Sequence, residues 1–231
     1  MSFDCMTISY SLSESQLSFF IGFFGGFVGF VGFVGFVDIF VEKTRQITRI
    51  VHSELGNIGK YCLVRSIYNE RFAVAEDLGL LLSTSGSTGN PKVVRLSKNN
   101  VISNMSAIVD YLEIGAHDRG LLSMPMSYSY GLSILHTHLS VGASVVVPQS
   151  TFLEKAFWDL CESVRVTSFS GVPYVYDALK KIGFLEKSLP NLKTLTQAGG
   201  PMPAVLTKEI AQFCDDTGKR YFSMYGQTEA S

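Results

Sequence analysis

The pattern of apolar and polar positions along the chain changes near residue 75. From there to the end, short apolar runs alternate with segments in which apolar residues recur at helical spacing. We predict strands over Leu78–Ser83, Lys92–Leu96, Gly120–Met124, Ala143–Val147, Val166–Ser170, Lys193–Thr196 and Arg220–Met224. We predict helices over Lys98–Leu112, Gly131–Leu139, Leu153–Ser163, Pro173–Lys180 and Pro203–Asp215. This alternation indicates an α/β domain over residues 75–231, with a mostly parallel sheet flanked by helices.

Residues 1–74 form a separate, atypical region. The stretch from Leu17 to Val37 contains no charge in 21 residues, and residues 26–37 are four copies of Gly-Phe-Val. About 20 apolar residues suffice for a transmembrane helix, here over residues 17–37. The basic residues that follow would then leave the rest of the chain in the cytoplasm. A period of three matches neither a helix face nor a strand face, so a low-complexity tract is the second interpretation. We expect a cytoplasmic protein, with membrane anchoring through residues 17–37 left open.

The overall composition narrows the classes of partner. The formal net charge is −1 over 231 residues, which argues against a nucleic-acid partner, because nucleic-acid binding needs a basic surface. The four cysteines form no Cys-x-x-Cys pair, so they imply free thiols in a reducing compartment and no disulfide framework. His136 and His138 would point to different faces of a helix, which does not favour a metal site made of histidines.

A loop rich in glycine and hydroxyl groups follows the first predicted strand of the α/β region. Residues 84–92 are Thr-Ser-Gly-Ser-Thr-Gly-Asn-Pro-Lys. Gly86 and Gly89 allow the backbone to approach a ligand closely. The surrounding hydroxyl and backbone N–H groups suit phosphate oxygens, and Lys92 can place a positive charge beside a pyrophosphate group. Asn90 and Pro91 precede the lysine, so the loop does not match the Gly-Lys-Ser/Thr pattern of a Walker loop.

The loop resembles the signature loop of the adenylate-forming superfamily, which includes acyl-CoA synthetases, firefly luciferase and the adenylation domains of peptide synthetases. Residues 224–231, Met-Tyr-Gly-Gln-Thr-Glu-Ala-Ser, are similar to the family's Tyr-Gly-x-Thr-Glu motif and follow the last predicted strand. Two looser similarities lie between these motifs, at Gln197–Pro201 and Met124–Leu132. The resemblance covers about Asp77 to Ser231 and implies the fold of the large N-terminal domain of such an enzyme.

The resemblance implies a role for each matching residue. Lys92, Thr228 and Glu229 would be catalytic, Glu229 would also hold Mg²⁺, and the Tyr225 ring would stack on adenine. Tyr128 and Gly199 would line the pocket for the acid. The residues implied to bind ATP are Thr84, Ser85, Gly86, Ser87, Thr88, Gly89, Lys92, Gly199, Gly200, Tyr225, Gly226, Gln227 and Thr228. On this interpretation the loop ending at Lys92 and the motif ending at Glu229 converge on one nucleotide.

The implied reaction uses ATP and Mg²⁺ to convert a carboxylic acid into an acyl-adenylate, followed by transfer to the thiol of coenzyme A or of a carrier. The family continues past the Tyr-Gly-x-Thr-Glu motif with a ribose-binding aspartate and a small domain that carries a catalytic lysine. We therefore expect a truncated domain without acyl-adenylate activity of its own, or one completed by a separate polypeptide. Two alternatives remain open: a non-catalytic nucleotide-binding remnant, and a membrane-tethered protein.

Overall fold

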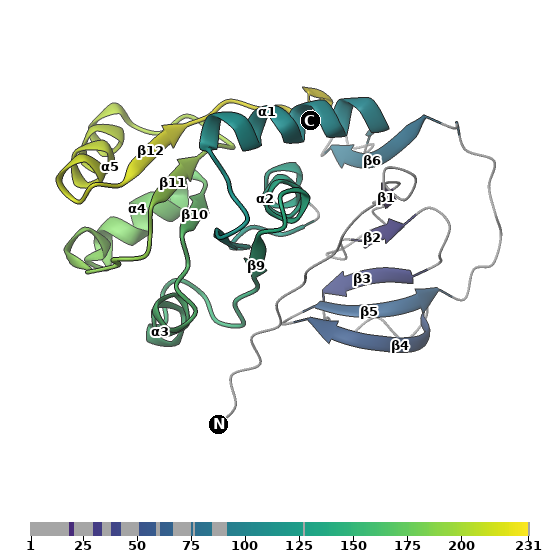
Figure 1. Ribbon diagram of the computed structural model, residues 1–231, viewed down its shortest axis with the longest axis horizontal. Coiled ribbons are helices and arrows are strands. Elements are labelled where there is room, and N and C mark those ends of the chain that lie inside the picture. Colours follow the sequence, from purple (N-terminus) through teal and green to yellow (C-terminus); the bar gives the residue numbers. More distant parts are fainter. Residues whose placement is uncertain are drawn as a thin grey trace.

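The computed structural model describes five strands between residues 19 and 66, and then residues 75, 77–84, 92–126 and 128–230 (Figure 1). The C-terminal part is an α/β fold whose centre is a five-stranded parallel sheet with the strand order β12-β11-β10-β8-β9. Its strands are β8 (Arg119–Leu121), β9 (Ser144–Val146), β10 (Ser168–Gly171), β11 (Thr194–Gln197) and β12 (Arg220–Ser223). The prediction of a parallel α/β sheet is confirmed, with strand ends at most three residues from those expected.

Helices cover both faces of this sheet. Figure 1 shows α1 and α2 on one side of the sheet and α3, α4 and α5 on the other. The helices are α1 (Lys98–Leu112), α2 (Ser129–Ser140), α3 (Lys155–Ser163), α4 (Pro173–Lys181) and α5 (Ala204–Asp216), with short 3₁₀ turns η3 (Phe184–Glu186) and η4 (Thr228–Ala230). Each of α2 to α5 connects one parallel strand to the next along the chain, as parallel pairing requires.

Two buried clusters lie on opposite faces of the sheet because successive residues of a strand point to opposite sides. At the end of β8, Leu121 belongs to one cluster and the next residue, Leu122, to the other. The aromatic cluster lies under α3, α4 and α5 and contains the rings of Phe157, Trp158, Phe169, Tyr176, Phe184 and Phe213. The aliphatic cluster lies under α1 and α2 and consists of Leu80, Leu82, Leu96, Val101, Leu122, Met126, Leu132, Ile134 and Val145.

The first two strands of the α/β region form a separate antiparallel hairpin and are not part of the parallel sheet. β6 (Leu78–Thr84) pairs with β7 (Lys92–Ser97), so that Thr84 lies opposite Lys92 at the mouth of the connecting loop. Only seven residues separate the two strands in sequence, and a parallel pair would need a crossover of a dozen or more. Leu80, Leu82 and Leu96 attach the hairpin to the aliphatic cluster.

Helix α1 begins directly after β7, and its start carries a capping box. The Asn100 backbone N–H donates to the Ser97 hydroxyl at 3.1 Å, and the Ser97 N–H donates to the Asn100 side-chain oxygen at 3.0 Å. These two bonds satisfy N–H groups that a helix start leaves open. The helix ends at Glu113, which adopts a left-handed conformation with φ 54°. The bounds predicted for this helix are confirmed.

The described residues of the N-terminal region form antiparallel strands in the order β1-β2-β3-β5-β4. They are β1 (Phe19–Phe20), β2 (Phe30–Phe33), β3 (Asp38–Glu42), β4 (Val51–Ile58) and β5 (Tyr61–Ser66). β1 and β2 fall inside residues 17–37, so the helix considered for that range is not what its described residues adopt. Backbone N–H and C=O groups make the strand pairing, and this pairing does not require a side-chain period. Among the helices in the described ranges, none combines the length and apolar character that crossing a bilayer requires.

Candidate active site

The carboxyl ends of the parallel strands form the edge at which a ligand site is expected. The chain passes from β8 to β9 in one direction along the sheet, and then continues on the other side of β8 with β10, β11 and β12. Ligands of open α/β sheets bind beyond the carboxyl ends of strands, where the strand order reverses. In this sheet the reversal lies between β8 and β10, so the segment that follows β8, residues 122–128, borders it.

Tyr128 and Gly199 meet at this edge, one from the segment after β8 and the other from the segment after β11. Gly199 has a φ of +83°, and a β-carbon at this position would lie 2.9 Å from the Tyr128 hydroxyl oxygen and 3.0 Å from Val172 Cγ1. Glycine is therefore required both by the backbone conformation and by the close approach of the tyrosine. Tyr128 keeps 39% of its surface exposed. The structure thus brings together the two residues predicted to line the acid pocket.

Gly200 follows Gly199 in the loop, and a side chain at Gly200 would not clash with its neighbours as one at Gly199 would. A β-carbon there would be 3.7 Å from Pro173 Cγ, which is an ordinary van der Waals distance. The side chain of Gln197 fixes the position of the loop, because its Nε2 donates to the Gly200 carbonyl at 2.8 Å. Its Oε1 accepts from the Ser223 hydroxyl at 3.0 Å, and its backbone carbonyl accepts from the Met224 N–H at 2.7 Å. Gln197 therefore ties the Gly199–Gly200 loop to the end of β12.

The sequence prediction assigned no role to Gln197, although its side chain is a polar group at the end of an apolar strand. It is 2% exposed. A buried amide needs partners in the protein, because leaving it unpaired costs about 1–3 kcal/mol. A glutamine two residues before a pair of glycines, at the end of an apolar strand, was therefore a signal that a side chain fixes the position of the loop.

Below the loop, a network of buried hydroxyl groups joins three strands. The Ser123 hydroxyl donates to the Ser170 carbonyl at 2.6 Å, and the Thr196 hydroxyl donates to Ser170 Oγ at 2.8 Å. Tyr130 bonds to Thr196 Oγ1 at 2.6 Å, and Tyr176 donates to the Thr196 carbonyl at 2.8 Å. Burial raises the pKa of both tyrosines, so both remain neutral phenols at physiological pH. Tyr130 is thus a packed residue, with 8% of its surface exposed.

The terminal motif lies beyond the end of β12 and is open to solvent. Tyr225 is 87% exposed, and the Gln227 side-chain amide donates to its hydroxyl. Thr228 and Glu229 lie in η4, which the Ala230 N–H closes by donating to the Gln227 carbonyl at 3.0 Å. A β-carbon at Gly226 would have no described atom within 4 Å. An exposed ring beside open backbone is an arrangement that can receive a planar base.

The glycine-rich loop lies mostly outside the described residues. Of its predicted ligands, Ser85, Gly86, Ser87, Thr88 and Gly89 are not described, whereas Thr84 and Lys92 are paired backbone positions of the hairpin. Strand β7, which Lys92 opens, lies in contact with η4, which carries Thr228 and Glu229. The strand that follows the loop therefore lies beside the turn that carries the terminal motif, and whether the loop itself converges with this motif on one nucleotide stays a prediction.

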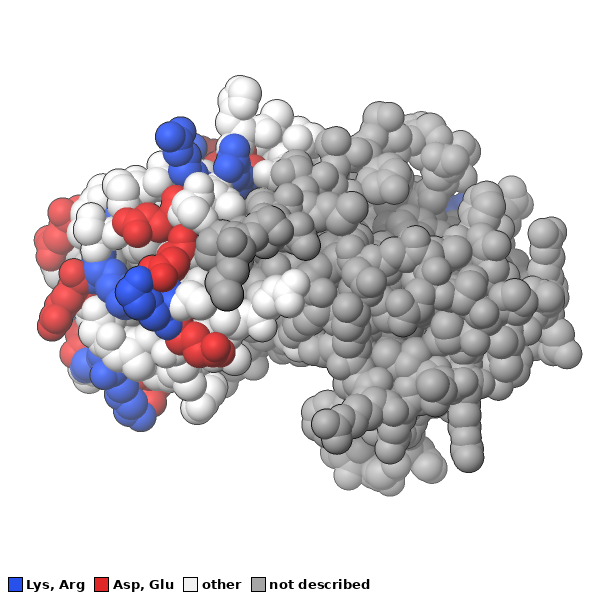
Figure 2. Space-filling view, turned by 90° about the horizontal axis from the view of Figure 1, so that it is seen from below, with Lys and Arg blue, Asp and Glu red and all other residues white. Residues whose placement is uncertain are grey.

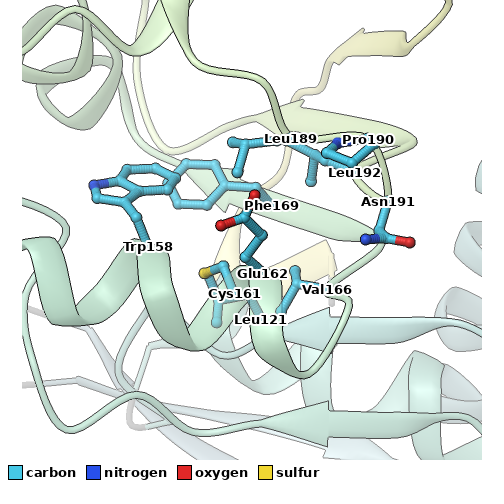
Figure 3. A pocket seen from close by; sticks show the side chains of 10 residues that line it. All are labelled: Leu121, Trp158, Cys161, Glu162, Val166, Phe169, Leu189, Pro190, Asn191 and Leu192. Carbon is cyan, nitrogen blue, oxygen red and sulfur yellow. The ribbon is translucent and has the colours of Figure 1, made fainter.

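Two cavities lie away from the Tyr128–Gly199 contact. Figure 3 shows an apolar hollow of about 310 Å³ empty volume on the α3 side of the sheet, with Trp158, Phe169 and Leu189 around it and Glu162 and Asn191 beside them. It belongs to the aromatic cluster. A second cavity, of about 480 Å³ empty volume, lies between α1, α2 and the sheet and is lined by hydroxyl groups, His138 and Arg220, with Met224 from the start of the terminal motif.

Few charged side chains lie at the candidate site. Among the described residues there is no group of three or more His, Cys, Asp or Glu side chains arranged to hold a metal ion. Glu229 is the acidic residue of the terminal motif, and one carboxylate suits Mg²⁺, which usually takes one or two carboxylates together with phosphate oxygens and water. On the face shown in Figure 2, acidic and basic side chains of the described residues are interspersed, and neither sign forms a large patch.

Comparison with known proteins identifies the family of this chain. Residues 41–231 match the family model described as AMP-binding enzyme. The chain belongs to this family. The matched range begins before the hairpin, and it includes β4 and β5 as well as every segment of the candidate site discussed above. The boundary between residues 74 and 75 stays a prediction.

The chain is also similar to individual proteins, both in sequence and in structure. The chain is 34% identical over 167 residues to an acyl-CoA synthetase, ALT10, of Alternaria alternata, and 30% identical over 157 residues to a feruloyl-CoA synthase of Amycolatopsis. These matches cover 71% and 68% of this chain but 28% and 31% of the relatives. The solved structure of o-succinylbenzoate coenzyme A synthetase from Bacillus subtilis, in complex with AMP, is 28% identical with a TM-score of 0.55 and matches 66% of this chain and 30% of its own.

Proposed function

We propose that this chain carries the ATP-binding and acid-binding edge of an enzyme that activates a carboxylic acid as an acyl-adenylate. In the first step a carboxylate oxygen attacks the α-phosphorus of ATP, and the bond to the leaving pyrophosphate breaks. In the second step the sulfur of a thiol, such as coenzyme A, attacks the acyl carbon, and AMP leaves. The single observation that supports the proposal is the contact between β7, which follows the glycine-rich loop in sequence, and η4, which carries Thr228 and Glu229.

The chain's own groups have distinct tasks in the first step. The loop 84–92 would surround the β- and γ-phosphates with hydroxyl and backbone N–H groups, and Lys92 would neutralise charge that develops on pyrophosphate. Thr228 would donate to the α-phosphate. Glu229 would hold Mg²⁺, which neutralises phosphate charge when bound. The exposed ring of Tyr225 would stack on adenine.

The acid would lie against Tyr128 and Gly199. Both are at the strand edge, where the Tyr128 hydroxyl closely approaches Gly199 and the tyrosine keeps 39% of its surface exposed. A substrate carboxylate held there would be positioned toward the nucleotide on the terminal motif, which is connected to the same loop through Gln197 and Ser223. Positioning of this kind is a large part of catalysis when two reactants must meet. The names of the relatives, an acyl-CoA synthetase and a feruloyl-CoA synthase, support coenzyme A as the acceptor.

Calorimetric titration with Mg·ATP tests the nucleotide assignment. Lys92→Gln and Glu229→Gln should each weaken binding about tenfold or more, since hydrogen bonds to charged groups are worth roughly 1.5–3 kcal/mol. Lys208→Gln on α5 and Glu162→Gln on α3 are matched controls, because both residues are exposed and distant in sequence from both motifs. Equal affinity in all four variants, or no binding by the unmodified chain, would contradict the proposal.

Acid-dependent exchange of labelled pyrophosphate into ATP tests the chemistry separately. Exchange that requires a carboxylic acid shows adenylation, whereas Mg·ATP binding without exchange limits this chain to a nucleotide-binding role. If the chain, alone or completed by a separate polypeptide, catalyses exchange, the Tyr128→Ala variant should alter the concentration of acid that gives half-maximal exchange, with little change in the dependence on ATP. A reversed pattern would remove Tyr128 from the acid pocket.

A further inference from the structure

Helix α1 lies between the two halves of the proposed nucleotide site. It follows β7 without a loop, and with 15 residues it is about 22 Å long. Figure 1 shows α1 extending from the β6 side of the molecule to β12, with the C-terminus beside it. The helix therefore passes from the strand that Lys92 opens to the strand that precedes the terminal motif.

Near its middle, α1 contacts the end of the terminal motif. The side-chain Nδ2 of Asn104 donates to the carbonyl of Ala230 at 3.3 Å. Ala230 directly follows Glu229 and is the last residue of η4. This bond therefore anchors the turn that carries Thr228 and Glu229.

Two turns further along, α1 contacts the beginning of the same motif. The hydroxyl of Tyr111 donates to Sδ of Met224 at 2.9 Å, and its ring centroid lies 6.1 Å from that of Phe222. Residues seven apart lie on the same face of a helix, about 10 Å from each other. Asn104 and Tyr111 thus hold the two ends of the segment 224–230 on one face of one helix.

The C-terminal end of α1 is fastened to β12 by a third contact. The Arg220 guanidinium donates to the Leu112 carbonyl at 2.8 Å and to Thr194 Oγ1 at 3.1 Å, and it forms an ion pair with Glu113. A guanidinium that donates to a terminal helix carbonyl satisfies a group left open by the helix end. The helix therefore cannot shift along β12 without breaking several hydrogen bonds at once.

Such fastening is needed because sheet pairing ends before the motif begins. β12 ends at Ser223, and the motif beyond it is largely exposed, with Tyr225 at 87%. Local bonds within 227–230 shape η4, and η4 also contacts β7 directly. Contacts from α1 add a second attachment, since α1 is continuous with β7.

We propose that Asn104 and Tyr111 are positioning residues, through which α1 holds the segment 224–230 in a fixed place relative to β7. This proposal rests on the proposed function for its consequence, but the attachment itself is a property of the chain without nucleotide. Neither residue belongs to the two motifs proposed to bind the nucleotide, and each acts through the segment that it holds.

Backbone amide deuterium exchange of the full chain tests the attachment. Asn104→Asp replaces the donating amide with a carboxylate of the same shape, and exchange over residues 225–230 should rise about fivefold, the effect of losing one hydrogen bond of ordinary strength. Tyr111→Phe keeps the ring and removes the bond to sulfur, a weak acceptor, so the rise should be about twofold. Asn99→Asp, which adds the same charge at an exposed position of the same helix, should leave this exchange unchanged.

The Mg·ATP affinity of the same variants tests the consequence. Asn104→Asp should weaken binding about threefold or more with exchange elsewhere in the chain unchanged, and Asn104→Gln, which restores a donor, should recover part of the loss. Unchanged exchange over 225–230 in Asn104→Asp and Tyr111→Phe would overturn the attachment. Faster exchange with unchanged Mg·ATP affinity would overturn the positioning role. An unmodified chain that does not bind Mg·ATP would overturn the proposed function, while the exchange result would still decide the attachment.

Discussion

The two faces of the parallel sheet are packed in different ways. On the α3–α5 face, six aromatic rings make a continuous set of contacts, with centroid separations of 5.0 Å between Phe157 and Trp158 and 5.5 Å between Phe184 and Phe213. On the α1–α2 face, the buried cluster is aliphatic, and beside it lie a polar cavity and the buried hydroxyl network. None of the predicted site residues belongs to the aromatic cluster, although Tyr176 of this cluster donates to the Thr196 carbonyl in the hydroxyl network. It follows that one face mainly stabilises the fold, and that the other supports the site.

The largest expected effect comes from the aromatic face. Phe169→Ala removes a ring that is 1% exposed and contacts Trp158, Tyr176 and Phe184. The free energy of unfolding should fall by about 4 kcal/mol, as for other buried phenylalanines, which urea denaturation measures. Tyr174→Ala on α4 is the control: its ring is 71% exposed, and a change within about 0.5 kcal/mol is expected. A loss below about 1 kcal/mol for Phe169→Ala would contradict the division between the faces.

The second largest effect is the pH dependence of the free energy of unfolding, which His136 on α2 should cause. Burial lowers the pKa of His136 from 6.5 to about 4. The unfolded chain therefore binds a proton more readily than the folded chain between pH 6.5 and 4, and stability must fall as the pH is lowered through this range. The slope should approach about 1.4 kcal/mol per pH unit and total about 3 kcal/mol.

Urea denaturation at several pH values measures this slope. His136→Gln removes the titrating group, so its stability should depend less on pH than that of the unmodified chain. His117→Gln, at an exposed position, should retain the original slope. The same slope in His136→Gln as in the unmodified chain would show that His136 does not cause it.

A smaller effect is expected at the site edge. Gly199→Ala forces a side chain into a left-handed conformation and against the Tyr128 hydroxyl at 2.9 Å, so a loss of about 2 kcal/mol is expected. In the double variant with Tyr128→Phe the contact with the hydroxyl is absent but the backbone strain remains. The double variant should therefore lose less than the sum of the two single losses. Additive losses, measured by denaturation, would show that Tyr128 does not approach Gly199.

The smallest effect compares two helix ends. Arg165 after α3 and Glu113 after α1 both have positive φ, 55° and 54°. Arg165→Gly relieves this conformation and should stabilise the protein by about 0.5–1 kcal/mol. Glu113→Gly relieves the same strain but loses the ion pair with Arg220, so its gain should be smaller. Differential scanning calorimetry measures both, and a larger gain for Glu113→Gly would mean that the ion pair with Arg220 does not stabilise the end of α1.

Much of the α/β part could be predicted from the sequence because its strands and helices follow the apolar period closely. The bounds of α1 agree fully, and those of β12 differ by one residue. The separation of the β6–β7 hairpin from the parallel sheet was not predicted, since apolar runs alone do not reveal pairing partners. The strands β1 and β2 were missed because backbone pairing leaves no two-residue period in a Gly-Phe-Val repeat.

The candidate site was predicted in part, for a similar reason. Motifs placed after strands located Tyr128 and Gly199, because parallel strands bring their carboxyl ends to one edge whatever their order in the chain. The supporting residues were missed. Gln197 acts on a loop three residues away, and Asn104 acts on a carbonyl 126 residues away, so neither contact leaves a local pattern. Long-range contacts between polar groups depend on the assembled fold.

The most direct test of the central claim is a crystal structure of the chain with Mg²⁺ and a non-hydrolysable ATP analogue. We predict that one nucleotide contacts both motifs: its phosphates would lie against residues 84–92 and Thr228, the metal ion against Glu229, and the base against Tyr225. A nucleotide bound elsewhere, or one that contacts only one of the two motifs, would contradict the account.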